Sequence, residues 1–149
     1  MNDLPSMTYE IVSKRRNNSP NPIYSPEDAY CLLKHFYSAK KEHFIVITLN
    51  GSHLPITVSI ISIGIANRTI VHPREVFIKA IEDRAIAIIV CHNHPSGSLK
   101  PSPEDNEITE RLYEAGKVIG INVLDHIIFS RNGYASLRKE GYFTFNGDA

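Results

Sequence analysis

The chain has 149 residues, of which 42% are hydrophobic and 21% are charged, so it is long enough for one domain with a buried core and too apolar for intrinsic disorder. Its 16 Lys and Arg residues balance its 16 Asp and Glu residues, which excludes the basic excess that tight nonspecific binding to nucleic acid requires. We therefore expect only weak, salt-sensitive association with DNA or RNA.

The sequence contains no N-terminal apolar signal segment and no apolar run long enough to span a bilayer. We therefore expect a cytoplasmic protein with no membrane partner. Two cysteines, Cys31 and Cys91, do not make a disulfide framework. The sequence is compatible with a homo-oligomer.

Residues 1–24 are predicted to form an N-terminal extension ahead of a domain at 25–149. Within the extension, residues 7–15 are typical of a short strand, and a loop rich in Pro, Asn and Ser follows. The domain begins with a predicted helix over 25–39, because Ser25 is a candidate N-cap, Pro26 occupies the first helical position and apolar residues recur at helical spacing.

Strands and helices alternate along the rest of the chain. Apolar runs predict strands at 43–50, 54–64, 85–91 and 122–130. Patterns that begin near a proline predict helices at 71–83 and 102–120, and the last segment, 133–145, is predicted to be an edge strand or tail. The Asn50-Gly51 dipeptide favours an antiparallel hairpin between the first two strands. This pattern indicates an α/β fold with a mixed central sheet flanked by helices.

The segment CHNHPSGSLKPSPED, residues 91–105, places polar groups directly after a hydrophobic strand. If strand geometry persists past Cys91, His92 and His94 point to the same face, and the Cys91 thiol points to the other face as a buried structural group. Asp105, in the first turn of the next helix, can return to the histidines as a third ligand. Two His and one carboxylate leave one position of a tetrahedral zinc open, which is typical of a catalytic zinc site.

An open zinc site needs a base, and two acids are candidates. Glu42 lies at the mouth of a strand, whereas Glu75 lies in the first turn of a helix, where its charge is favourable in any case. The residues alone leave both open. Ser102 either caps its helix only or also faces the reacting carbonyl.

Two further polar residues, Asp125 and His126, lie in the strand at 122–130. A pair of this kind can support metal ligands from behind. More often it caps or fills a strand, and we expect this second role here.

His92-x-His94, seven intervening residues and Ser102-x-x-Asp105 together resemble the JAMM motif of the JAB1/MPN+ metallopeptidases. The segments VHPREVFIKAI, CHNHPSG, PSPED and LDHIIFS resemble the RadC-type bacterial branch of that family, over about residues 25–140. RadC-like proteins commonly carry an N-terminal helical region, and we expect this chain to lack one.

The resemblance implies a cytidine-deaminase-like α/β fold with Zn²⁺ held by His92, His94 and Asp105 and a water in the fourth position. It implies that Ser102 steadies a tetrahedral intermediate and that a glutamate acts as general base. In the wider family that glutamate opens the first central strand, a position that Glu42 occupies in KKEHFIVITL.

Two functions remain as hypotheses. The first is a zinc-dependent metallohydrolase that cleaves a peptide or isopeptide bond in a peptide or protein substrate. The second is a non-catalytic or nucleic-acid-associated module linked to DNA repair or recombination. The complete set of candidate ligands and the balanced charge favour the enzyme.

Overall fold

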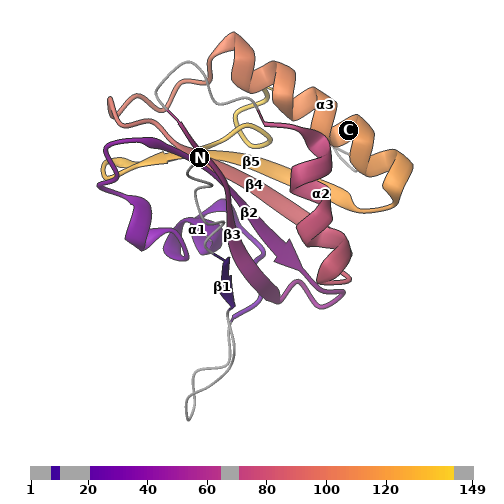
Figure 1. Cartoon of the computed structure of the whole chain (residues 1–149). Helices are drawn as coiled ribbons and strands as arrows, with labels where there is room; N and C mark the ends of the chain where they lie inside the picture. The colour runs from indigo at the N-terminus through magenta and orange to yellow at the C-terminus, as the bar shows by residue number, and fades with distance from the viewer. Residues whose placement is uncertain (1–7, 11–20, 65–70, 143–149) are drawn as a thin grey trace, which may run out of the picture.

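A computed structural model describes residues 8–10, 21–64 and 71–142, and its centre is one six-stranded sheet in the order β1-β3-β2-β4-β5-β6 (Figure 1). The strands are β1 (Thr8–Glu10), β2 (Glu42–Leu49), β3 (Pro55–Gly64), β4 (Ala87–Asn93), β5 (Asn122–Ser130) and β6 (Gly133–Ser136). The helices are α1 (Pro26–Cys31), α2 (Pro73–Glu82) and α3 (Pro103–Ile119), and a 3-10 turn spans Lys34–Phe36. The β4–β5 pair is parallel and the other neighbouring pairs are antiparallel. The predicted α/β fold with a mixed sheet is confirmed.

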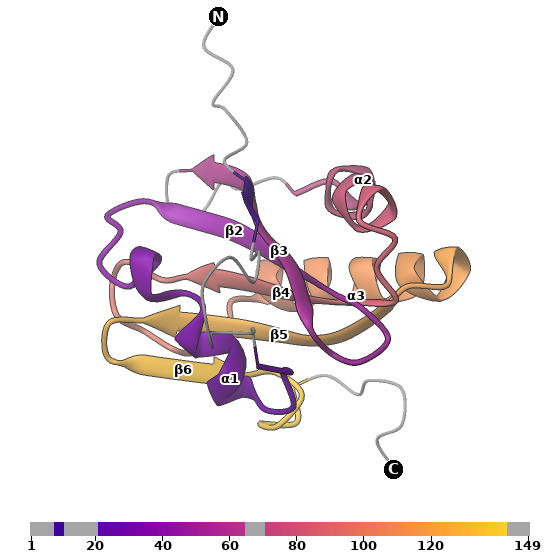
Figure 2. The same ribbon diagram turned by 90° about the horizontal axis from the view of Figure 1, so that it is seen from below.

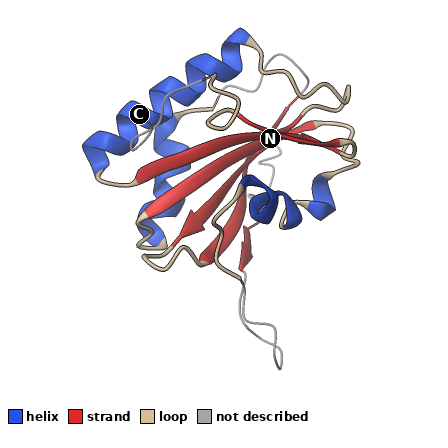
Figure 3. Ribbon diagram, turned by 180° about the vertical axis from the view of Figure 1, so that it is seen from behind, coloured by secondary structure: helices blue, strands red, loops and turns tan. Residues whose placement is uncertain are grey.

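The helices cover both faces of the sheet, α2 and α3 on one and α1 on the other (Figures 2 and 3). Each face has its own hydrophobic cluster, and the alternation of β4 assigns its residues to them. Ile88 and Val90 join the cluster beneath α2 and α3. Ile89 and Cys91 join the cluster beneath α1. The Cys91 thiol is therefore buried on the face opposite to Val90, as predicted.

The connection from β4 to β5 passes through α3, which has strong signals at both ends. Ser102 and Asp105 form a capping box at its start, with Pro103 at the first helical position. The helix ends at Gly120, whose φ of 86° is left-handed and favours glycine. Gly116 allows close packing, since a Cβ there would collide with the carbonyl oxygen of Ile121. None of the helices in the described ranges is long and apolar enough to cross a membrane.

The predicted helix over 25–39 is too long. The α-helix stops at Cys31, and a 3-10 turn at Lys34–Phe36 follows. Residues three apart eclipse one another in 3-10 geometry, so Leu33 and Phe36 both face the sheet and are buried. Burial against the sheet therefore overrides the continuous helical pattern.

The boundaries of β4 also differ from the prediction of 85–91. Arg84 adopts a left-handed φ of 53° after α2, so the next two residues belong to the turn. The strand then continues through Asn93, because it remains paired with β5 as far as Phe129. The hairpin between β2 and β3 is antiparallel, as predicted.

Two predicted segments lie partly outside the described residues. Of the strand predicted at 7–15, Thr8–Glu10 is observed, and residues 7 and 11–15 lie outside the described ranges. Residues 16–20 of the loop that follows also lie outside them. Of the segment predicted at 133–145, Gly133–Ser136 forms the edge strand β6, and 143–145 lie outside.

Cys91 is buried and Cys31 is exposed, so the two thiols should differ in reactivity. Burial raises the pKa of the Cys91 thiol well above its ordinary value, whereas Cys31 is exposed. Iodoacetamide at neutral pH should therefore modify Cys31 in the folded protein and leave Cys91 unmodified, as read by peptide mass spectrometry. In guanidinium chloride both should react. Equal labelling of Cys91 and Cys31 in the folded protein would contradict the face assigned to Cys91.

Candidate metal centre

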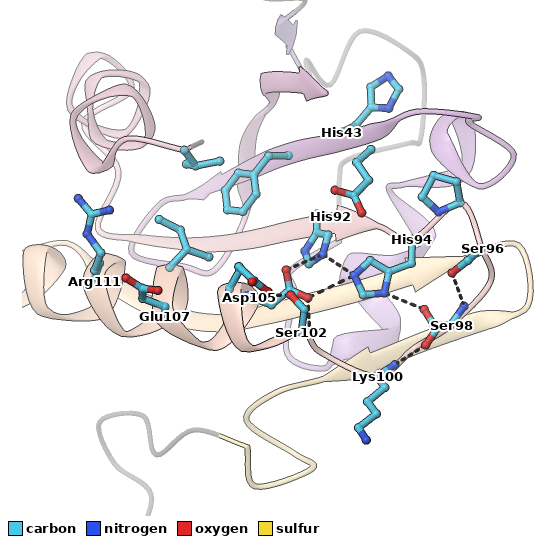
Figure 4. Close-up of a pocket in the computed structure, with 16 residues that line it drawn as sticks. His43, His92, His94, Ser96, Ser98, Lys100, Ser102, Asp105, Glu107 and Arg111 are labelled. Atoms are coloured by element: carbon cyan, nitrogen blue, oxygen red, sulfur yellow. Dashed lines mark hydrogen bonds and ion pairs between the residues drawn. The ribbon is translucent and has the colours of Figure 1, made fainter. Parts of the chain in front are cut away.

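A cleft of about 570 Å³ opens where β4 ends and α3 begins (Figure 4). His92 is the residue before the last of β4, His94 opens the loop that follows, and Asp105 lies in the first turn of α3. All three line the cleft, together with Glu42 and Ser102. The parallel crossover therefore brings the strand end and the helix start to one place, the usual position of ligand sites in open α/β sheets.

The donor atoms of His92, His94 and Asp105 form a compact triangle. The two histidine Nε2 atoms lie 2.8 Å apart, and the Asp105 carboxylate oxygens lie 3.1 Å from His92 Nε2 and 3.2 Å from His94 Nε2. A tetrahedral zinc with bonds of about 2.05 Å separates its ligands by about 3.3 Å. An expansion of a few tenths of an ångström would therefore fit the ion, and the nitrogen and oxygen donor set suits zinc. Among the described residues, His92, His94 and Asp105 are the group of His, Cys, Asp or Glu side chains whose ligand atoms lie close enough together, within 4.8 Å of one another, to hold one metal ion.

The charges of the triangle also suit a cation. Burial favours the neutral form of Asp105, but hydrogen bonds to His92 and His94 outweigh it and hold the pKa of the carboxyl well below its usual range. Burial also opposes protonation of His94, but the hydrogen bond and the charge of Asp105 outweigh this effect and raise the pKa of His94. The aspartate is thus an anion at neutral pH, available to a metal or to a histidine proton.

The loop after β4 orients His94. The Ser98 carbonyl oxygen lies 2.9 Å from His94 Nδ1, and a carbonyl can only accept, so the proton resides on Nδ1. Nε2 is then the nitrogen that faces the triangle: with a proton it donates to Asp105, and without that proton its lone pair is free for a metal. Gly97 makes the tight turn with a left-handed φ of 90°, and its N–H donates to the His94 carbonyl at 2.9 Å.

A chain of buried hydrogen bonds orients His92. Its Nδ1 lies 2.9 Å from His126 Nε2, and His126 Nδ1 lies 2.5 Å from Thr109 Oγ1. The Thr109 hydroxyl donates to the Asp105 carbonyl at 2.6 Å. Because that carbonyl can only accept, the direction of the chain is set: His126 Nδ1–H donates to Thr109, and His92 Nδ1–H donates to His126. Nε2 of His92 is therefore the nitrogen that faces the triangle, where it can donate a proton to Asp105 or offer its lone pair to a metal.

The prediction that Asp125 and His126 merely fill their strand is wrong for His126. Burial, with the neighbouring His92, lowers the pKa of His126 to about 3, so it supports His92 as a neutral ring. Asp125 has the structural role, since it accepts hydrogen bonds from the Ser136 hydroxyl and the Arg138 N–H. The sequence reasoning missed Thr109; its spacing of four from Asp105 on one helix was the available signal.

The structure separates the two candidate bases. Glu42 begins β2, is partly buried and lines the cleft, and its charge contributes to the raised pKa of His94. Glu75 is exposed in the first turn of α2 and is not among the residues that line the cleft. Ser102 caps α3, as expected, since its Oγ accepts the Asp105 N–H at 3.1 Å while Asp105 Oδ2 accepts the Ser102 N–H at 2.8 Å.

This fold and this set of residues define a JAB/MPN-like domain. A family model described as RadC-like JAB domain matches residues 23–142, and the chain belongs to that family. The resemblance seen in the JAMM-like motif is therefore confirmed.

Several curated proteins are similar in sequence to this chain. A UPF0758 protein of Clostridium acetobutylicum is 51% identical over 120 residues, 80% of this chain and 52% of its own. A UPF0758 protein of Caldanaerobacter subterraneus is 50% identical over 124 residues, 83% of this chain and 53% of its own. A UPF0758 protein of Methanococcoides burtonii is 44% identical over 131 residues, 88% of this chain and 55% of its own. The chain spans about half the length of these relatives.

The hydrogen-bond chain behind His92 predicts a role for Thr109 in metal affinity. When His92 Nε2 binds a metal, Thr109→Val leaves the buried His126 Nδ1–H without its acceptor, which should lower zinc affinity by about tenfold or more. Thr109→Ser keeps the hydroxyl and should stay close to the parent. Competition with a chromophoric chelator measures both affinities. A Thr109→Val protein that is folded and binds zinc as tightly as the parent would refute this role.

Proposed function

We propose that the protein is a zinc-dependent metallohydrolase that cleaves a peptide or isopeptide bond in a peptide or protein substrate. The observation that carries this proposal is the convergence of His92, His94 and Asp105 in a cleft that Glu42 also lines. The complete set of donors and the balanced charge of the chain favour an enzyme over a non-catalytic or nucleic-acid-associated module.

The triangle would supply three zinc ligands and leave the side that faces the cleft open. A zinc ion held there would lower the pKa of a water to about 7 and polarise a carbonyl oxygen. Ser98 and His126 hold the two histidine rings with their Nε2 atoms toward the triangle, so the proposed ligands would need no reorientation to bind the ion. The hydrogen bond from the Ser102 N–H holds the carboxylate.

Glu42 is the proposed general base. It lies on the cleft wall, and alternation along β2 places it on the same face as Phe44, which pairs with His92. Its carboxylate would accept a proton from the attacking water and deliver it to the leaving amine, a role typically worth 10²–10⁴ in rate. Glu75 offers no comparable position.

Ser102 is proposed to serve both roles considered for it. Its oxygen accepts the Asp105 N–H, which uses a lone pair and leaves the hydroxyl proton available to donate. That proton would stabilise the oxygen of the tetrahedral intermediate. The cap thus fixes the hydroxyl at the cleft.

The cleft itself suits a peptide chain. Its volume of about 570 Å³ lies within the usual range for ligand sites. Phe44, Val71 and Ile108 provide apolar wall, while Lys100 and Arg111 add positive charges to the lining. Apolar side chains of a substrate would pack against the apolar wall and exclude water from it. Carbonyl or carboxylate oxygens of the substrate would bind Lys100 and Arg111.

Substitution of a metal ligand and substitution of the base should have different effects on zinc content and turnover. Asp105→Ala should lose zinc and activity together, because a ligand retains the ion. Glu42→Gln keeps its shape but cannot accept a proton, so it should retain one zinc per chain while turnover falls by about 10²-fold or more. The measurements are zinc content and single-turnover cleavage of a peptide selected from a library.

Glu75→Gln is the matched control for Glu42→Gln, since it removes one exposed carboxylate outside the cleft. Its turnover should stay within a few-fold of the parent. Normal cleavage by Glu42→Gln would overturn the assignment of the base. Full zinc retention by Asp105→Ala would overturn the assignment of Asp105 as a zinc ligand.

A further inference from the structure

Asn93 lies between the two histidines of the triangle, one residue beyond the point where β4 stops pairing with β2. Within the described residues, the pairing of β2 with β4 ends at Phe44 and His92. Glu42, two residues before Phe44, is paired on its other side with Gly64 of β3. On the β4 side, the peptide groups that flank Glu42 therefore need a partner other than a strand.

The Asn93 side chain takes that place. Its Oδ1 accepts the backbone N–H of His43 at 2.6 Å, and its Nδ2 donates to the carbonyl of Lys41 at 2.9 Å. A weaker contact of 3.5 Å runs from Nδ2 to the Ala39 carbonyl. Because an N–H can only donate and a carbonyl can only accept, these partners also fix which way the amide is turned. One side-chain amide thus binds the peptide groups on both sides of Glu42.

Burial makes this link strong. Asn93 is 1% exposed, so water does not compete for its hydrogen bonds. If the amide is removed, the Lys41 carbonyl and the His43 N–H both lose a partner at the start of β2. The start of the strand would then be free to move relative to β4.

We propose that Asn93 is a positioning residue that holds Glu42 at a set distance from the metal ligands. This inference rests on the proposed function, because it assigns Asn93 a role through Glu42 as the base. His92, Asn93 and His94 are consecutive, so two of them present Nε2 atoms to the triangle while the one between them fixes the segment that carries Glu42. Base and ligands are thereby held by one tripeptide.

A double-mutant cycle tests this role. Asn93→Ala and Glu42→Gln are made singly and together, and Asn93→Asp is added because it keeps the acceptor for the His43 N–H but cannot donate to Lys41. Ser136→Ala is the control for loss of a buried hydrogen bond elsewhere, since its hydroxyl donates to Asp125. The readouts are amide hydrogen exchange, zinc affinity, kcat and KM, and the pH dependence of the visible spectrum of the cobalt-substituted protein.

If Asn93 acts through Glu42, Asn93→Ala should lower kcat by about tenfold or more, change KM and zinc affinity little, and cost almost nothing further in the Glu42→Gln background. The spectral pH transition should shift as in Glu42→Gln, without a further shift in the double mutant. His43 amide exchange should accelerate in Asn93→Ala and stay protected in Asn93→Asp and Ser136→Ala. Asn93→Asp, with half of the link, should fall between the parent and Asn93→Ala in kcat.

Equal losses of kcat, or equal spectral shifts, from Asn93→Ala in the parent and in Glu42→Gln would overturn the proposal, because independent effects add. So would parent-like kcat in a folded Asn93→Ala protein. If the parent cleaves no peptide, the proposed function fails by itself, and the cobalt spectra with hydrogen exchange still decide the role of Asn93. If Asn93→Ala does not fold, the same cycle is run with Asn93→Asp.

Discussion

The hydrogen bonds between Ser102 and Asp105 are the contacts on which both the fold and the site depend. As a capping box they satisfy backbone N–H groups at the start of α3, a contribution of about 1 kcal/mol in typical proteins. The same carboxylate faces both histidines of the triangle, and the peptide carbonyl of Asp105 accepts the Thr109 hydroxyl that begins the chain to His92. The start of one helix therefore supplies one proposed ligand and contacts the other two.

The alternation of β4 explains how one strand serves core and site together. Its odd-numbered residues Ile89 and Cys91 fill the cluster beneath α1, and its even-numbered residues run from Ile88 and Val90 to His92 on the opposite face. The strand is buried throughout, so the polar residues at its end must be satisfied by protein groups. His92 and Asn93 meet this requirement through His126 and the backbone at the start of β2.

Buried polar groups around the site form two separate supports. On one side His126 and Thr109 set the proton position on His92, and on the other side Asn93 holds the segment that contains Glu42. Each support ends on a backbone group that only donates or only accepts, the Asp105 carbonyl in one and the Lys41 carbonyl and His43 N–H in the other, which leaves few alternative arrangements. This is the preorganisation that a metal-assisted hydrolysis would need, since ligands and base must be placed before substrate binds.

Much of the fold could be predicted because its signals are local. Pro103 and Ser102 mark the start of α3, Asn50-Gly51 marks the hairpin, and uncharged apolar runs mark the central strands. The grouping of His92, His94 and Asp105 could also be predicted, because the i and i+2 positions of a strand share a face and a capped helix follows after a short loop. These relations span few residues, so spacing alone carries them.

Only the tertiary structure decided which residues far apart in the sequence meet at the site. The strand order puts β2 beside β4, and this alone brings Glu42 to the cleft wall and leaves Glu75 outside. The parallel pairing of β4 with β5 brings His126 behind His92, a contact between residues 34 apart that no local period encodes. Packing against the sheet likewise ended α1 at Cys31, where the sequence pattern alone continued. Local periodicity determines which face a residue presents, but only the packing of the sheet determines what that face meets.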